Sequence, residues 1–325
     1  MSMTRREWIF TAGALTLSGL LGSVPATARM QDAPRPAGNR KRSIRIAHLT
    51  DIHVQPERAA GLGMETCLKH VQQQADKPTL ILTGGDLIMD SFDHDAPRTK
   101  LQWELFTKVL KDSCGVPVRH TLGNHDIWGW SKKKSKTTGD EPMWGKKWAC
   151  ETLGLAKPYH SYDQAGWHFV HLDSVSPDGE GYCGKLDDEQ MDWLKADLAK
   201  TDAKTPVLVI SHIPIVSVAP AINGKEDPKL VDHKIGGGVM HRDAIQLKNL
   251  FLKYRNVKVC LSGHLHLNER IDFNGVTYLC NGAVSGAWWR GKNAETANGY
   301  ALIDLFDDGT FENRYVEYEW KVVDA

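Results

Sequence analysis

The sequence predicts an α/β fold. Short apolar runs with the length of strands alternate with longer segments whose apolar residues recur at helical spacing. Hydrophobic residues make up 41% of the 325-residue chain and charged residues 25%, which excludes wholesale disorder because this composition can form a core. The expected strands cover residues 44–49, 80–82, 116–122, 167–172, 207–210 and 257–261.

Helices are expected between these strands, over residues 62–75, 186–198 and 242–254. In the second of them Asp187 is a suitable N-cap, and Met191, Leu194 and Leu198 recur at helical spacing. From about residue 270 the pattern changes to short strands and turns, which predicts a C-terminal set of antiparallel strands over residues 275–279, 300–306 and 313–319. Residues 43–325 are therefore expected to form a single domain, with insertions at 127–160 and 213–240.

Residues 1–28 have the features of an export signal. The pair Arg5-Arg6 precedes a weakly apolar stretch, and Ala26-Thr27-Ala28 has the small-x-small pattern of a cleavage site. The arginine pair resembles a twin-arginine signal, which implies the twin-arginine export machinery as a partner and a periplasmic or secreted location. The alternative is a membrane anchor, but the stretch is short and rich in Gly, Ser and Thr, so the mature chain is expected to have no transmembrane segment. Residues 29–42 are expected to be a flexible linker.

Charge and cysteine content narrow the classes of partner. Forty Lys and Arg residues balance forty Asp and Glu residues, whereas a protein that binds polymeric nucleic acid usually carries a basic excess. Six cysteines without a C-x-x-C pair give little support for a thiolate zinc site and leave any disulfide pairing open. Cys260 and Cys280 lie in apolar runs and are expected to be buried.

Side chains that can bind a metal follow five of the expected strands. Because ligands of open α/β sheets bind beyond the carboxyl ends of the strands, these side chains are expected to lie together. Their nitrogen and oxygen donors suit Mn, Fe or Zn, and the two carboxylate oxygens of Asp86 allow it to bridge two ions. The motifs are Asp51-Ile52-His53, Gly85-Asp86, Gly123-Asn124-His125-Asp126, Ser211-His212 and Gly263-His264-Leu265-His266.

This ordered set resembles the motifs of the calcineurin-like metallophosphoesterase family, over residues 51–266. The resemblance implies a two-sheet αββα sandwich that holds two metal ions in one cleft. It also implies that His125 is no ligand but stabilises the phosphoryl oxygens or protonates the leaving group. One ion would be bound by Asp51, His53, Asp86 and His266, and the other by Asp86, Asn124, His212 and His264.

The same resemblance implies an enzyme that hydrolyses a phosphate ester by attack of a metal-bound hydroxide, because coordination lowers the pKa of water toward ~7. The pattern is most similar to the branch that holds the class III cyclic-nucleotide phosphodiesterases. Met89 stands where purple acid phosphatases have a metal-bound tyrosine, and Asp126 stands where protein Ser/Thr phosphatases have Glu, which disfavours both classes. A small phosphodiester is the expected substrate. The alternatives are a phosphomonoesterase, a nucleotide pyrophosphatase, or a binding protein without activity.

Aromatic and basic side chains near these motifs are candidates for substrate contacts. Trp128 and Trp130 directly follow the Gly-Asn-His-Asp motif, and Trp288, Trp289 and Arg290 lie in a Gly-rich loop. Tryptophan can stack on a base or a sugar. The alternative is that these tryptophans pack beneath long loops.

Overall fold

The computed structural model describes residues 40–223 and 233–323, which all belong to one compact unit, Asp32–Ala325. The predicted export signal lies outside the described residues. So does most of the predicted linker. Its last residue, Arg42, begins the first strand, and Arg40 forms an ion pair with Glu312.

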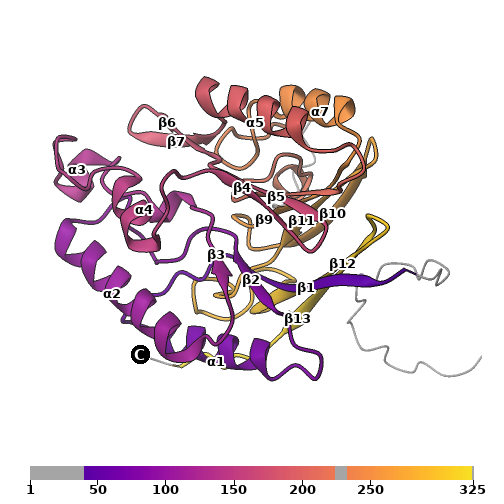
Figure 1. Cartoon of the computed structure of the whole chain (residues 1–325). Helices are drawn as coiled ribbons and strands as arrows, with labels where there is room; N and C mark the ends of the chain where they lie inside the picture. Colours follow the sequence, from indigo (N-terminus) through magenta and orange to yellow (C-terminus); the bar gives the residue numbers. More distant parts are fainter. Residues whose placement is uncertain (1–39, 224–232, 324–325) are drawn as a thin grey trace, which may run out of the picture. The chain divides into compact units, whose positions relative to one another are not determined.

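The first of two large sheets contains strands from both ends of the unit (Figure 1). Strands β1, β2 and β3 are parallel, and β12 joins β1 in an antiparallel pair that β13 extends. The strand order is β13 (Phe311–Glu317), β12 (Gly299–Phe306), β1 (Arg42–Leu49), β2 (Leu80–Thr83) and β3 (Val118–Arg119).

The second sheet has a parallel centre and antiparallel edges. Strands β11, β9, β8 and β5 run parallel, whereas β10 and β4 pair with their neighbours in the antiparallel direction. A separate hairpin consists of β6 (Val175–Asp178) and β7 (Gly181–Gly184). The order of the sheet is β10 (Asn268–Phe273), β11 (Val276–Asn281), β9 (Val257–Ser262), β8 (Val207–Ser211), β5 (Trp167–Leu172) and β4 (His160–Gln164).

Helices cover the outer face of each sheet, so the predicted αββα sandwich is confirmed (Figure 1). Helices α1 (Ala60–Gln72) and α2 (Ala96–Ser113) pack on the first sheet, and α5 (Asp188–Lys200) and α7 (Ala244–Lys253) on the second. No helix within the described ranges is both long and apolar enough to cross a membrane. The short helices are η1 (Asn124–Asp126), α3 (Lys132–Ser135), α4 (Lys147–Leu153) and α6 (Ala219–Ile222).

A third apolar layer joins the two sheets. Alternate residues of each strand face it, as the two-residue period of a strand requires. Ile44 and Ile46 of β1 meet Trp167 and Phe169 of β5 there. The intervening residue of β1, Arg45, points away and pairs with Asp304 of β12. The strands therefore cannot slip by one residue without exposing this layer.

The structure differs from the sequence-based expectation at several elements, of which β3, α2 and the C-terminal strands are the most informative. Residues 116–122 form only a two-residue strand, because Pro117 has no N–H to donate and the following residues turn toward the carboxyl edge of the sheet. Helix α2 is not predicted, although Asp95 caps it by accepting from the Arg98 backbone N–H. The three predicted C-terminal strands are present but divided: β11 lies in the second sheet, beside the unpredicted β10, and β12 and β13 lie in the first.

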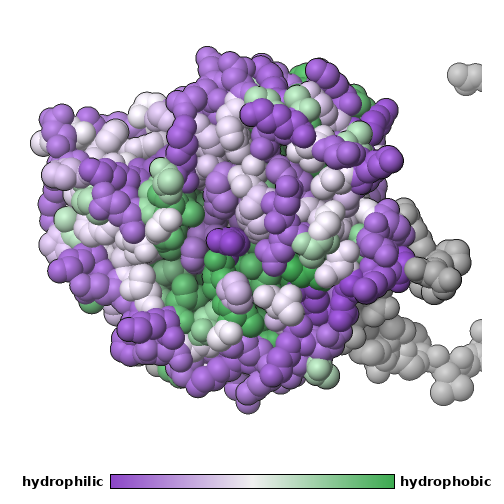
Figure 2. Space-filling view, viewed as in Figure 1, coloured by the Kyte–Doolittle hydropathy of each residue, from purple (hydrophilic) through white to green (hydrophobic). Residues whose placement is uncertain are grey.

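The cysteines behave as small apolar residues. All six have free thiols, and Cys260 and Cys280 are buried, as predicted. Cys114 lines a cavity of about 250 Å³ between α2, β3 and α4. Apolar side chains gather in this hollow (Figure 2). None of the side chains that line this cavity belongs to a motif of the predicted metal site.

Candidate metal centre

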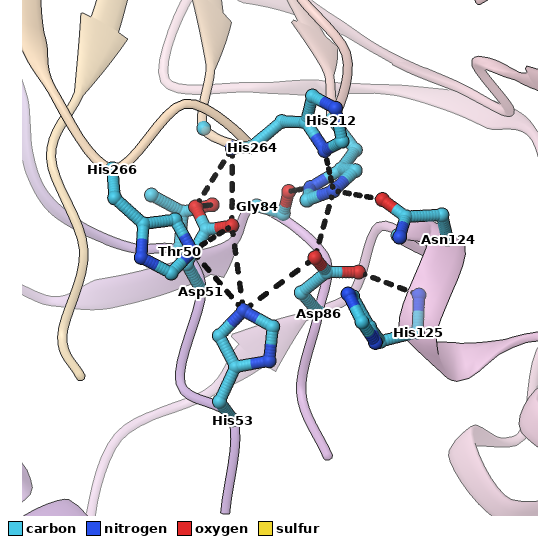
Figure 3. A network of polar contacts seen from close by, with 12 residues as sticks. Thr50, Asp51, His53, Gly84, Asp86, Asn124, His125, His212, His264 and His266 are labelled. Atoms are coloured by element: carbon cyan, nitrogen blue, oxygen red, sulfur yellow. Dashed lines mark hydrogen bonds and ion pairs between the residues drawn. The ribbon is translucent and has the colours of Figure 1, made fainter. Parts of the chain in front are cut away.

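The motif side chains gather at the carboxyl ends of parallel strands from both sheets (Figure 3). Asp51 follows β1, Asp86 follows β2 and Asn124 follows β3 in the first sheet. His212 follows β8 and His264 follows β9 in the second. These five side chains point toward one another, as the strand-end argument predicts.

The backbone at these positions adopts a conformation that few residues with a side chain occupy. Left-handed φ angles are found at Asp51 (54°), His53 (46°), Asp86 (52°), His264 (69°) and His266 (55°). Five of the seven predicted ligands thus sit in a sparsely populated region, although Asp and His tolerate it better than β-branched residues do. The surrounding structure maintains this conformation through backbone bonds such as Asp51 N–H to Gly85 O at 3.0 Å.

Two glycines in the motifs permit close approach of the loops to the carboxylates. A Cβ on Gly123 would lie 2.2 Å from Asp86 Oδ1, and a Cβ on Gly263 would lie 2.2 Å from Asp51 Oδ2. Any larger residue would push the carboxylate out of place. These glycines therefore belong to the site although they carry no functional group.

One group of donor atoms surrounds Asp51. Its Oδ1 lies 3.3 Å from His266 Nε2 and 3.9 Å from His53 Nε2. The two imidazole nitrogens are 3.1 Å apart, and Asp86 Oδ2 lies 3.6 Å from His53 Nε2. Four donors from three loops thus converge on one small volume.

A second group of donor atoms shares Asp86 with the first. Its Oδ2 lies 3.2 Å from His212 Nε2, which is also 3.2 Å from Asn124 Oδ1 and 3.2 Å from His264 Nδ1. One carboxylate oxygen of Asp86 therefore faces both groups. Its other oxygen, Oδ1, accepts the His125 backbone N–H at 2.8 Å, which fixes the orientation of the carboxylate.

The hydrogen bonds of the four histidines identify which ring nitrogen is free to bind a metal. Each ring places its other nitrogen beside a backbone carbonyl, which can only accept, so that nitrogen carries the proton. The lone pairs of the remaining nitrogens converge within the two donor groups. The carbonyl contacts are His53 Nδ1 with Met89 O (3.4 Å), His212 Nδ1 with Gly84 O (2.7 Å), His264 Nε2 with Gly238 O (2.8 Å) and His266 Nδ1 with Gly286 O (2.5 Å).

These residues fit divalent or trivalent metal ions. His266 Nε2 lies 3.1 Å from His53 Nε2 and 3.3 Å from Asp51 Oδ1, so lone pairs face one another there, and a bound cation would relieve their repulsion. Donor atoms within 4.8 Å of one another include the triads Asp51–His53–His266 and Asp86–His212–His264. All are nitrogen or oxygen, the set that suits Mn, Fe or Zn.

Burial and charge set the protonation of the site without metal. Burial lowers the pKa of His53 to about 3 and, together with the charge of His212, that of His264 to about 4, so both rings are neutral. Burial also acts on His212, but the charge of Asp86 outweighs it and raises the pKa of His212 to about 9. Burial alone would raise the pKa of Asp86, yet His212 and His125 hold it well below its ordinary value. A metal ion that binds here must displace the proton of His212.

His125 lies beside the donor groups, and donor atoms of His53, Asp86 and His125 also lie within 4.8 Å of one another. Its Nδ1 contacts Asp90 Oδ1 at 3.2 Å, and its ring meets that of His53 edge-on at 5.0 Å. Burial lowers its pKa, but the charges of Asp86 and Asp90 outweigh this and raise it to about 9. Its side chain is 30% exposed, so a protonated imidazole faces solvent at the edge of the site.

Two carboxylates outside the predicted ligand set, Asp90 and Asp126, also support the site. Asp126 is buried, and its carboxylate accepts the backbone N–H groups of Leu87 (2.8 Å), Ile88 (3.3 Å) and Gly123 (2.8 Å). It thereby ties the loop of Asp86 to the loop of Asn124. Asp126 ends the predicted Gly-Asn-His-Asp motif, whereas Asp90 lies outside the motifs, so only Asp126 could have been singled out from its place in the sequence.

The structure separates the five candidate substrate contacts. Trp128 is 5% exposed and packs edge-on against Trp148, and Trp289 is fully buried, so neither ring has a face free for substrate. Trp130 is half-buried against Phe92. Trp288 and Arg290 are exposed. Trp128 and Trp289 therefore pack beneath loops, as the alternative interpretation of the sequence had it.

An αββα sandwich whose strand ends bring Asp, Asn and His side chains into two adjoining groups defines the class of metallophosphoesterases. The model of one family, the calcineurin-like phosphoesterases, matches residues 44–268. The chain belongs to this family, which makes it a metal-dependent hydrolase of phosphoesters.

Several curated proteins are similar in sequence. The chain is 26% identical over 248 residues to a 3′,5′-cyclic adenosine monophosphate phosphodiesterase, CpdA, of Haemophilus influenzae, covering 74% of this chain and 76% of that protein. It is 24% identical to a 3′,5′-cyclic-nucleotide phosphodiesterase of Nostoc, covering 85% and 93%. Purple acid phosphatase 21 of Arabidopsis thaliana is 31% identical over 178 residues, which cover 52% of this chain and 34% of that protein.

Solved structures show the same fold. A dimetal phosphatase from Danio rerio superposes with a TM-score of 0.58 at 14% identity, covering 86% of this chain and all of that one. The GAP50 protein of Plasmodium superposes with a TM-score of 0.53 at 16% identity, covering 85% of each chain. At these identities the likeness concerns the fold alone.

Proposed function

We propose that the protein is an exported phosphodiesterase that uses two metal ions to hydrolyse a small phosphodiester. The observation that carries the proposal is the convergence of two groups of nitrogen and oxygen donor atoms on one oxygen of Asp86. A single carboxylate shared between two groups is the arrangement that holds paired ions close enough to act on one phosphate. Zero net charge favours a small ester over polymeric nucleic acid.

The preference for a diester is supported by relatives named as cyclic-nucleotide phosphodiesterases, which align over three quarters or more of their own length. The part of the chain that resembles a purple acid phosphatase favours a phosphomonoesterase as second candidate. Met89 provides no phenol for a metal, and this weighs against that class. A nucleotide pyrophosphatase on the same metal core is a third candidate.

The metal ions would be held by the two donor groups. Asp51, His53, Asp86 and His266 would hold one ion, and Asp86, Asn124, His212 and His264 the other. When bound, such ions supply Lewis-acid activation of water and neutralise charge on the phosphoryl oxygens. The donor set accepts Mn, Fe or Zn.

His125 is the residue placed to handle the leaving group. Its protonated ring is partly exposed beside the shared Asp86, whereas the four ligand histidines direct their lone pairs inward. Ions bound at Asp86 reduce the effect of that carboxylate on the His125 pKa and leave Asp90 as its lasting partner. The ring can then donate its proton to the departing oxygen or hydrogen-bond the phosphoryl group, and Asp90 holds it in position.

The experiment is a hydrolysis panel on metal-reconstituted protein with bis(p-nitrophenyl) phosphate, p-nitrophenyl phosphate and 3′,5′-cyclic AMP. We expect turnover of the diesters, and a loss of about 10²- to 10⁴-fold in kcat for His125→Ala. Turnover of the monoester alone would transfer the assignment to a phosphatase. No turnover of any of the three by protein with metal bound would contradict the proposal.

Two variants distinguish the role of a metal ligand from that of a proton donor. Asp86→Ala is expected to lose both metal and activity because the carboxylate serves both donor groups. His125→Ala is expected to lose activity but keep its metal because its ring belongs to neither group as we assign them. Metal analysis of the purified variants checks this. Loss of metal in His125→Ala to the same extent as in Asp86→Ala would contradict the assignment of His125.

The proposal of export is supported by the sequence of residues 1–28. Replacement of Arg5-Arg6 by Lys-Lys is expected to retain the protein in the cytoplasm, whereas the wild type is expected in the periplasm or medium without these residues. Cell fractionation and the mass of the mature chain measure both. Normal export of the double variant would contradict the twin-arginine route.

A further inference from the structure

One tryptophan beside the metal centre is not packed away. Among the tryptophans that the structure describes, only Trp288 has an exposed side chain, with 37% of its surface open to solvent. Its ring lies 4.6 Å from the ring of His266, at an angle of 41°, and 6.1 Å from that of His53. An apolar ring is thus left open to solvent directly beside two candidate ligands.

The loop that carries Trp288 is anchored from below. The next residue, Trp289, is fully buried, donates its indole N–H to His53 O at 2.9 Å and packs edge-on against Trp320. The carbonyl of Trp288 accepts from Arg58 at 3.1 Å. Left-handed φ angles at Trp288 (52°) and Trp289 (69°) direct one ring outward and the next inward. The exposed ring is therefore held in place by its neighbour.

Among the residues that the structure describes, the aromatic rings on the His264 side of the centre are packed against one another. Tyr182 lies 6.0 Å from the ring of His264, but it is half-buried and packs edge-on against Phe92 at 5.8 Å. Phe92 in turn packs against Trp130. These rings occupy one another, so the ring free to accept a partner is that of Trp288.

We propose that Trp288 is a stacking platform for an aromatic ring carried by the alcohol that is esterified to the phosphate, such as the base of a nucleoside. The inference rests on the proposed function. Aromatic rings associate at centroid separations of about 4.5–7 Å, so a planar group on Trp288 would lie within reach of a phosphate at the neighbouring donor groups. The protein would accordingly prefer nucleotide diesters to aliphatic ones.

The test compares a diester with a base to one without a base. Trp288→Ala is expected to raise KM for 3′,5′-cyclic AMP by about 5- to 150-fold, as loss of base stacking does elsewhere, while kcat changes little. KM of the variant for ribose 3′,5′-cyclic phosphate is expected to stay within about twofold of the wild-type value, because this substrate has no base to stack on Trp288. Trp288→Phe keeps an aromatic face and is expected to fall between the two proteins.

A binding measurement removes catalysis from the comparison. In a His125→Ala background with metal bound, calorimetry with 3′,5′-cyclic AMP is expected to show the same loss of affinity when Trp288→Ala is added. Phe273→Ala, which truncates an exposed aromatic at the β10–β11 turn, is the matched control and is expected to change neither constant. Thermal melting of each variant checks that the fold is kept.

Equal effects of Trp288→Ala on both cyclic phosphates, or no effect on either, would overturn the platform. Failure of the proposed function gives a different result, because the wild type itself would then hydrolyse neither compound. In that case binding of 3′,5′-cyclic AMP in the His125→Ala background still tests Trp288, and an affinity unchanged by Trp288→Ala would refute it.

Discussion

At the scale of single residues, the site depends on side chains that constrain its ligands as much as on the ligands themselves. Backbone carbonyls orient the four histidines, and Asp126 fixes the two loops that carry Asp86 and Asn124. His125 has a partner of its own in Asp90. The contacts of Asp126 and Asp90 can be removed by substitution without changing a residue assigned as a metal ligand.

Asp90→Asn is expected to lower kcat for a diester by about 10- to 100-fold while the metal content is unchanged, because His125 loses the charge that orients and protonates it. Steady-state kinetics with metal analysis measure both. Asp93→Asn is the matched control, since Asp93 pairs with the exposed Lys134 on the surface. Equal kinetics for both variants would contradict the role of Asp90.

Asp126→Asn is expected to lower the free energy of unfolding by about 1–3 kcal/mol, since an amide cannot accept all three backbone N–H groups and leaves buried donors unpaired. Urea unfolding of metal-free protein measures this. Stability equal to that of the wild type would show that the carboxylate does not tie the two loops together.

At the scale of elements, the loop of Trp288 and Trp289 rests on helix α1. A Cβ on Gly63 would lie 2.0 Å from the Trp289 ring, whereas one on Gly61 would lie 3.3 Å from the flexible end of Leu105. The two glycines lie in the same helix, so changing either to alanine gains about 1 kcal/mol of helix propensity. Only Gly63 opposes a ring that cannot move.

Gly63→Ala is therefore expected to lower the free energy of unfolding by about 1–3 kcal/mol, because overpacking outweighs the gain in helix propensity. Gly61→Ala is expected to cost less or to stabilise. Urea unfolding of both variants gives the comparison. The account of the Trp289 anchor fails if Gly63→Ala is the more stable of the two.

His168 of β5 joins two elements by contacts with Asp163 of β4 (2.6 Å) and Asp197 of α5 (2.8 Å). Burial lowers its pKa, but these carboxylates outweigh it and raise the pKa above the ordinary value of 6.5. The stability it contributes is therefore complete below pH 6.5 and is lost as pH rises through the raised value. The difference in unfolding free energy between wild type and His168→Gln should shrink with rising pH. A difference that is constant or that grows would contradict this.

The sequence predicted most parallel strands close to their observed bounds, including β1, β2, β8 and β9, which end in motifs, whereas β3 is much shorter than predicted. Strand β1 and the Asp51 motif are evident because a short apolar run ends in residues with ligand chemistry. Helix α2 was missed because its apolar face is sparse: Trp103 and Phe106 are its only large apolar residues that are buried. The sequence could not predict that Trp288 is exposed and Trp289 buried, because left-handed backbone angles at both residues decide where the rings point.

At the scale of the whole unit, the metal centre joins the two sheets. Asp51, Asp86 and Asn124 come from the first sheet, and His212, His264 and His266 follow strands of the second. Ions bound among them would cross-link the layers at their carboxyl edge, where the inter-sheet core gives way to polar side chains such as His48 and His171.

Removal of metal is accordingly expected to destabilise the fold. An ion that binds only the native state at a hundred times its dissociation constant adds about 2.7 kcal/mol, so a chelator should lower the melting temperature and added metal should restore it. Calorimetry in both conditions measures the shift. Asp86→Ala is the control and should show almost none. An equal shift in this variant would place the stabilising ion elsewhere.

The central claim is that two metal ions share Asp86 and act on one diester. The most direct measurement follows turnover of bis(p-nitrophenyl) phosphate while metal-free protein is titrated with metal under stoichiometric conditions. Turnover is expected to reach its plateau only at about two ions per chain. A plateau at one ion per chain, or no turnover at two, would contradict this claim.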